Sequence, residues 1–166
     1  MSQSNHPPQT TYQVSPIGYV HRDDGGASIH ILEPYRPALR QLERFSHVIV
    51  LWWAHQRDNQ EFRGMLQCRP PYADDVLTGV FATRAEYRPN PVALTTSKIL
   101  EVDQASGILR LGDIDAFDGT PVLDLKAYFP VCDRVQNASI PEWLDFGMDW
   151  MPDAGLGLYE ESDLAQ

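Results

Sequence analysis

The stretch GVFATRAEYRPNPVALTTSKI, residues 79–99, decides how this chain can fold. Val80 and Phe81 before its centre are apolar, and the positions after it that are apolar or β-branched, as is typical of strands, are Val92, Leu94, Thr95, Thr96 and Ile99. The centre, residues 88–91 (RPNP), holds two prolines, which offer no N–H to a sheet and push the preceding residue into extended geometry. The centre is therefore predicted to be stiff and extended, outside any central strand. Two interpretations stay open, a rigid connection between strands and a wall that faces a ligand.

The composition is that of one globular domain. The 166 residues are 43% hydrophobic and 22% charged, which suffices for a core. No apolar run approaches the roughly 20 residues of a membrane span. The first residues lack the basic and apolar regions of a signal peptide, so we expect a cytoplasmic protein without a membrane segment. Cys68 and Cys132 have no C-x-x-C partner and are expected to be reduced thiols.

The charge is unevenly spread along the chain. The net charge is -10, yet residues 1–100 hold ten basic and nine acidic side chains, and residues 101–166 hold three and fourteen. A uniformly acidic protein would repel a phosphate backbone, but the first part could present an arginine face. Such a face could bind nucleic acid, or the arginines could simply be solvated. They are Arg36, Arg40, Arg44, Arg57, Arg63, Arg69, Arg84 and Arg88.

Many short strands separated by turn residues favour a closed sheet. The predicted fold class is mainly β, a single small β-barrel with a few short helices. We expect a flexible lead at residues 1–11, the barrel domain at 12–140 and an acidic tail at 141–166. The predicted strands are 10–23, 29–35, a central strand 47–56 covered on both faces, 92–103, 108–117 and 121–130; a helix is predicted over 37–46 and a long polar connection over 57–75.

Histidines and aspartates are the candidate polar site residues. The histidines at positions 6, 21, 30, 47 and 55 show no metal-ligand spacing, so no metal is expected. His55 and Gln56 end the predicted central strand, where side chains can face a pocket. Residues 113–124 crowd four aspartates, which repel one another unless donors or cations compensate.

The strand 121–130 has one apolar and one more polar face. The apolar face is predicted to hold Leu123, Leu125, Ala127 and Phe129, and the other face Val122, Asp124, Lys126 and Tyr128. The polar face either meets water or lines a site. Asp113, by contrast, fits a turn residue that caps its own backbone.

Three ordered blocks carry a family resemblance: FSHVIVLWWAHQ (45–56), GVFATRAEYRPNPVALT (79–95) and LGDIDAFDGTPVLDLKAYFP (111–130). With them the chain resembles the TsaA-like β-barrel methyltransferases over roughly residues 12–135. The best-known members, the tRNA methyltransferases O, use S-adenosylmethionine to N6-methylate threonylcarbamoyl-adenosine beside the tRNA anticodon. The resemblance implies a small barrel, usually a homodimer, with S-adenosylmethionine near the dimer interface and tRNA as partner.

The resemblance also implies site residues. The implied cofactor contacts are His55, Gln56, Arg84, Leu94, Asp115, Ala116, Phe117 and Asp118. The implied groups near the methyl acceptor are Arg88, Asn90, Asp124, Lys126 and Tyr128, with Asp124 or Tyr128 orienting the acceptor or taking its proton.

The chain also departs from the family pattern. Ala93 stands where the family usually has glycine, Ala127 stands where it usually has proline, and residues 21–30 do not contain the family's Pro-Arg-Gln-type loop. These departures bear on the methyl acceptor more than on the cofactor. Two alternatives therefore remain, a methyltransferase of the same fold with a small-molecule acceptor and a non-catalytic S-adenosylmethionine-binding module.

Overall fold

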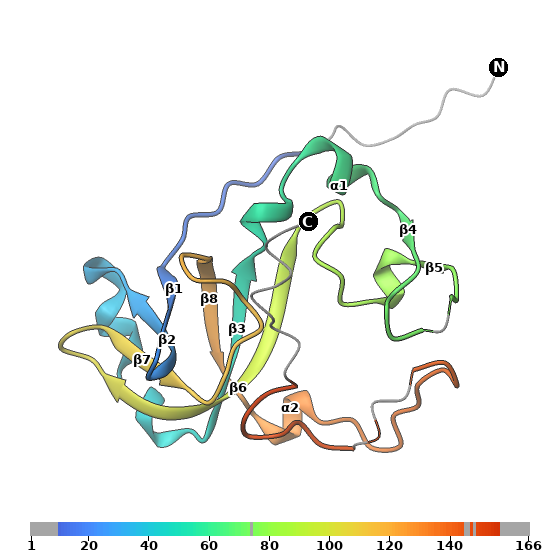
Figure 1. Cartoon of the computed structure of the whole chain (residues 1–166). Helices are drawn as coiled ribbons and strands as arrows, with labels where there is room; N and C mark the ends of the chain where they lie inside the picture. The colour runs from blue at the N-terminus through green and yellow to red at the C-terminus, as the bar shows by residue number, and fades with distance from the viewer. Residues whose placement is uncertain (1–9, 74, 145–146, 148, 157–166) are drawn as a thin grey trace.

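The fold is a closed six-stranded barrel with a small side lobe, seen in a computed structural model that describes residues 10–73, 75–144, 147 and 149–156 (Figure 1). The predicted mainly-β barrel is confirmed. Most of the predicted N-terminal lead, and residues 145–146, 148 and 157–166 of the predicted acidic tail, lie outside the described residues. The barrel order is β1-β2-β7-β6-β3-β8. Its strands are β1 (Gly18–Asp23), β2 (Gly26–Ile31), β3 (His47–Trp53), β6 (Val92–Asp103), β7 (Ile108–Leu111) and β8 (Pro121–Ala127).

The side lobe lies to the right of the barrel in Figure 1 and contains the two-stranded sheet of β4 (Gln67–Cys68) and β5 (Thr78–Gly79). Short helices connect the strands. They are the 3-10 turns η1 (Glu33–Leu39), η2 (Leu42–Arg44), η3 (His55–Arg57) and η4 (Val80–Ala82), and the α-helices α1 (Gln60–Gly64) and α2 (Pro130–Asp133). No helix in the described part of the chain has the length and apolar character needed to cross a membrane.

The core fills the barrel interior from alternate positions of each strand. On β3, Val48, Val50 and Trp52 are buried, whereas Ile49 and Leu51 are half-buried on the outside. The predicted central position of β3 is confirmed, because the strand pairs with both β6 and β8. The prediction that both of its faces are covered is wrong. In a closed barrel the core reaches one face of each strand, and the other faces outward.

Three local predictions are corrected near the N-terminus. The strand predicted over 10–23 begins only at Gly18, and the next strand starts at Gly26 rather than residue 29, because a tight turn joins β1 and β2. The Asp23 carboxylate accepts the Gly25 N–H at 2.8 Å in that turn. The predicted helix 37–46 is instead two 3-10 turns, since Gln41 adopts a left-handed conformation with φ of 73° between them.

The RPNP segment lies outside the strands, as predicted, and leads directly into β6. Val80 and Phe81, predicted as strand, form the 3-10 turn η4 instead. The strand predicted over 108–117 ends at Leu111, and residues 112–120 form a loop that returns to β8, hereafter the 112–120 loop.

A bulge in β8 corrects the predicted faces of that strand. Leu51 pairs with Asp124 while the next residue, Trp52, pairs with Val122, so Leu123 is the extra residue. Val122 is consequently fully buried inside the barrel and does not share a face with Asp124. Asp124 and Lys126 point outward, beside Leu51 and Ile49 of β3.

Candidate functional site

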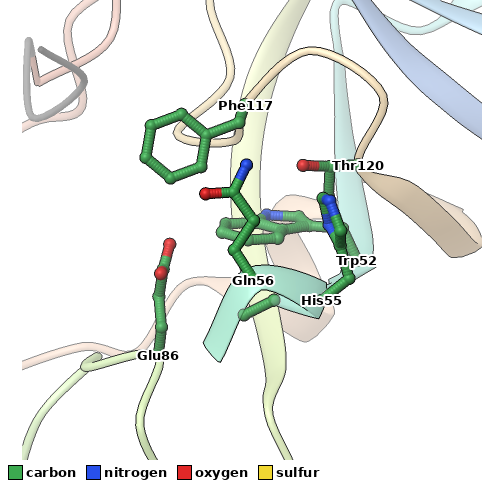
Figure 2. A pocket seen from close by; sticks show the side chains of 7 residues that line it. Trp52, His55, Gln56, Glu86, Phe117 and Thr120 are labelled. Carbon is green, nitrogen blue, oxygen red and sulfur yellow. The ribbon is translucent and has the colours of Figure 1, made fainter. Parts of the chain in front are cut away.

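A shallow pocket lies where β3 ends, and three separate segments meet there (Figure 2). Its volume is about 150 Å³, part of it open to solvent. It is a shallow surface depression that is open to solvent on one side, not an enclosed cavity. The lining residues are Trp52, Ala54, His55, Gln56, Glu86, Phe117 and Thr120.

The floor of the pocket is held by hydrogen bonds around the end of β3. The Trp52 indole N–H donates to the Thr95 hydroxyl at 3.1 Å, and the Ala54 N–H donates to the Pro91 carbonyl at 2.9 Å. Pro91 has no N–H to continue the ladder, so β3 turns into η3 at this point. That turn brings His55 and Gln56 to the pocket rim.

The 112–120 loop is attached to the barrel by Arg22 of β1. Its guanidinium donates to the Ala116 carbonyl at 2.7 Å, to the Ile114 carbonyl, and to the Asp113 carboxylate at 3.3 Å. The Arg22 side chain is 19% exposed. Three backbone or carboxylate oxygens of one loop therefore share one half-buried cation, and Phe117 is set over the pocket.

Two carboxylates give the pocket a negative field. Burial and the nearby Asp115 raise the pKa of Glu86, and Arg57 partly opposes this shift. Burial and repulsion by Asp113, opposed by Arg22, raise the pKa of Asp115. Asp115 is exposed to solvent, so water screens its charge more than that of Glu86. Raised carboxyl pKa values of this kind mark positions where a bound cation would be stabilised.

The RPNP segment is held from both sides. The Arg88 guanidinium donates to the Val80 carbonyl at 3.3 Å, and the Arg63 guanidinium of α1 donates to the Pro89 carbonyl at 3.3 Å. Arg63 also pairs with Asp58, which accepts the Trp53 indole N–H at 2.9 Å. The Arg63 guanidinium lies 5.5 Å from the centre of the Trp53 ring. These contacts, together with its prolines, make the segment a firm support for the pocket.

The structure brings part of the implied cofactor set together. His55, Gln56 and Phe117 line the pocket, and Asp115 lies close enough to Glu86 to raise its pKa. Ala116 is buried under the loop. Asp118 instead turns towards β1, where it accepts the Arg22 backbone N–H at 2.9 Å and lies 3.3 Å from the His21 ring.

Two further implied cofactor residues, Arg84 and Leu94, also lie outside the pocket. Arg84 is exposed on the segment before RPNP. Leu94 is 40% exposed on the outside of β6, opposite Leu51.

The implied acceptor residues do not gather in the pocket. Asp124 and Lys126 form an ion pair of 2.8 Å on the outside of β8. The Tyr128 ring lies 6.2 Å from the His47 ring, near the opposite end of β3 from the pocket. Arg88 is half-buried, and Asn90 is exposed.

Sequence reasoning missed two residues of this site, Glu86 and Arg22. Glu86 stands inside FATRAEYRPNP, where the prolines and arginines drew attention. Arg22 lies more than ninety residues from the loop that it holds, so no local pattern points to it. No group of three or more His, Cys, Asp or Glu side chains that could hold a metal occurs within the described ranges.

Comparison with known proteins shows the family to which the chain belongs. Residues 5–134 match the family described as the tRNA-methyltransferase O N-terminal domain, which covers most of the sequence. The chain belongs to this family.

Named relatives of the family member include archaeal and bacterial proteins. A probable S-adenosyl-L-methionine-binding protein of Pyrococcus abyssi is 35% identical over 130 residues, 78% of this chain and 66% of the relative. A tRNA (adenine(37)-N6)-methyltransferase of Escherichia coli K12 is 40% identical over 116 residues, 67% of this chain and 48% of that enzyme. The chain thus spans about half to two thirds of the length of these two relatives.

Solved structures show the same fold. The crystal structure of TrmO from Pseudomonas aeruginosa superposes with a TM-score of 0.61 at 32% identity, over 78% of this chain and 62% of that one. Another crystal structure of TrmO gives a TM-score of 0.62 at 34% identity, over 79% and 64%.

Proposed function

We propose that this family member is an S-adenosylmethionine-dependent methyltransferase that N6-methylates adenine in tRNA. The observation that carries the proposal is the family match over residues 5–134, joined to a pocket built from the matching segments. The relatives are named as an S-adenosyl-L-methionine-binding protein and as a tRNA (adenine(37)-N6)-methyltransferase. The acceptor in the proposal is threonylcarbamoyl-adenosine beside the anticodon, and a tRNA substrate implies a cytoplasmic location.

The pocket residues fit the chemistry of S-adenosylmethionine. The Phe117 ring offers aromatic surface for the adenine or the sulfonium, and Gln56 offers an amide for hydrogen bonds. Glu86 and Asp115 offer negative charge for the sulfonium and the ammonium. The cofactor supplies an electrophilic methyl group, and the residues of this chain bind it, orient it and exclude water.

A homodimer is part of the proposal, because an apolar strip lies on the outside of the barrel beside the implied acceptor residues. Val92 is 37% and Leu94 is 40% exposed, and the outward residues of β3 between them and β8 are half-buried. We define this β3–β6 face by Ile49, Leu51, Trp53, Val92 and Leu94. A second copy covering it would bring Asp124 and Lys126 of each protomer to the interface, and could extend the shallow pocket.

The acceptor-side roles follow from position and chemistry. Asp124 is the proposed group that orients the acceptor amine or takes its proton, and Lys126 holds its carboxylate at 2.8 Å. Tyr128 is the second proposed group. Exposed Arg40, Arg44 and Arg84 are the proposed contacts to tRNA phosphates.

The test is methyl transfer from labelled S-adenosylmethionine to total tRNA. The tRNA is taken from cells that lack the gene for this protein, so that the acceptor position is unmethylated. We expect labelled N6-methylated threonylcarbamoyl-adenosine after nuclease digestion. Label found only in small metabolites would favour the small-molecule acceptor, which the net charge of -10 supports. Cofactor binding without any labelled product would favour the binding module, the activity in the name of the Pyrococcus relative.

A further inference from the structure

Glu86 is an acidic side chain placed in the wall of the pocket. It comes from the segment that leads into RPNP and faces the Gln56 amide and the Phe117 ring across the pocket (Figure 2). Its side chain is 29% exposed. A carboxylate in this position must be balanced by positive charge, because leaving it half-buried without a partner costs free energy.

The protein compensates the negative charge of Glu86 only weakly. The Arg57 guanidinium of η3 is 3.9 Å from its carboxylate, at the limit of an ion pair, and lies 5.3 Å from the centre of the Phe62 ring. From the 112–120 loop, Asp115 repels it. His55, the other titratable lining residue, comes from η3. The pocket therefore carries a local excess of negative charge beside aromatic surface, which suits a cation with an apolar shell.

We propose that Glu86, together with the nearby Asp115, lets the pocket discriminate the cationic methyl donor from its neutral demethylated product. This inference rests on the proposed function. In methyl transfer the carbon–sulfur bond breaks, its electron pair stays on sulfur, and a carbon–nitrogen bond forms as the acceptor nitrogen loses a proton. The sulfonium becomes a neutral thioether, while the adenosine, amine and carboxylate of the cofactor are unchanged.

The loss of positive charge on the cofactor sulfur during methyl transfer is what would let Glu86 affect turnover. The donor gains attraction from Glu86, and the product loses it, so the same pocket favours loading of the donor and departure of the product. An opposite charge within about 4–6 Å commonly changes an equilibrium by tenfold or more. Glu86→Gln keeps the size and shape of the side chain and removes its charge.

The experiment is calorimetric titration of S-adenosylmethionine and S-adenosylhomocysteine into the wild type, Glu86→Gln and Glu43→Gln. Glu43 is an exposed acid on η2, at the other end of β3, and its variant makes the same change in net charge. We expect Glu86→Gln to weaken donor binding about tenfold and to leave product binding within about twofold. Glu43→Gln should match the wild type with both ligands.

A second arm needs no variant. Because burial and the nearby Asp115 raise the pKa of Glu86, lowering the pH from neutral towards that raised pKa should protonate Glu86 and reduce the wild-type preference for donor over product. The inference would be overturned if Glu86→Gln lost the same affinity for donor and for product, or if the wild-type preference for donor over product did not change with pH. Either result would leave the proposed function intact. Wild-type protein that binds neither ligand would overturn both.

Discussion

The Arg22 guanidinium of β1 donates a 2.7 Å hydrogen bond to the carbonyl of Ala116, ninety-four residues later in the chain. The same side chain also holds Ile114 and Asp113, so the 112–120 loop is fixed to the barrel from inside. A loop without regular structure can present Phe117 to the pocket because its carbonyls are satisfied by this one cation.

Replacing Arg22 should therefore loosen the loop and destabilise the barrel. We expect Arg22→Ala to lower the free energy of unfolding by about 3 kcal/mol, because a half-buried hydrogen-bonded charge network loses its cation. Urea unfolding measures this loss. Arg40→Ala, an exposed arginine on the surface, should change stability by less than about 0.5 kcal/mol. If Arg22→Ala lowers the free energy of unfolding no more than Arg40→Ala does, the 112–120 loop keeps its conformation without Arg22.

The β3–β6 face should mediate self-association. We expect the wild type to sediment as a dimer and Leu94→Asp to sediment as a monomer with an unchanged far-ultraviolet circular dichroism spectrum, because a buried charge in an apolar interface is costly whereas the barrel core is untouched. Leu100→Asp is the matched control, since Leu100 is 59% exposed on the same strand outside this face. A monomeric wild type, or a dimeric Leu94→Asp variant, would exclude this face as the interface.

Glu86 should make stability depend on pH. Its folded-state pKa lies above the ordinary glutamate value of 4.5, so the folded state binds more protons than the unfolded state at pH values in the window between the two. Stability then falls as the pH rises from 4.5 through the raised pKa. Glu86→Gln should remove that loss and be more stable than the wild type above the window, with no gain below it. Urea unfolding across a pH series checks the sign, and a variant less stable at high pH would contradict it.

The contact from α1 should keep the RPNP segment rigid. We expect Arg63→Ala to increase amide hydrogen exchange of the non-proline residues in 83–90, because the Pro89 carbonyl loses its donor. The loss of global stability should stay below about 1 kcal/mol, as for exposed ion pairs. Arg69→Ala removes an exposed pair with Asp75, at 2.6 Å, and should leave that exchange unchanged. Equal exchange in both variants would show that the prolines alone hold the segment.

Local chemistry explains what the sequence could predict of the fold. The unbroken apolar run of β3 predicted a central strand, and the proline pair at 89 and 91 predicted a stiff segment, because both signals depend only on neighbours in the chain. The faces of β8 could not be predicted, since one extra residue at Leu123 reverses the alternation and its position depends on pairing with β3.

The residues of the site also differ in whether the sequence could predict them. His55, Gln56 and Phe117 stand in quoted blocks and line the pocket, and their contact with the cofactor stays a prediction. Arg22 escaped because its partners are distant in sequence. Glu86 escaped because its environment comes from Asp115 and Arg57, which only the closed barrel brings near.

The central claim is that S-adenosylmethionine binds in the pocket at the end of β3. Titrating it into isotope-labelled protein and following the backbone amide resonances by NMR tests this claim most directly. We predict the largest shifts at His55, Gln56, Glu86 and Phe117, with Glu43 at the other end of β3 unmoved. Shifts centred on the β4–β5 lobe, or no shifts at saturating ligand, would contradict the account.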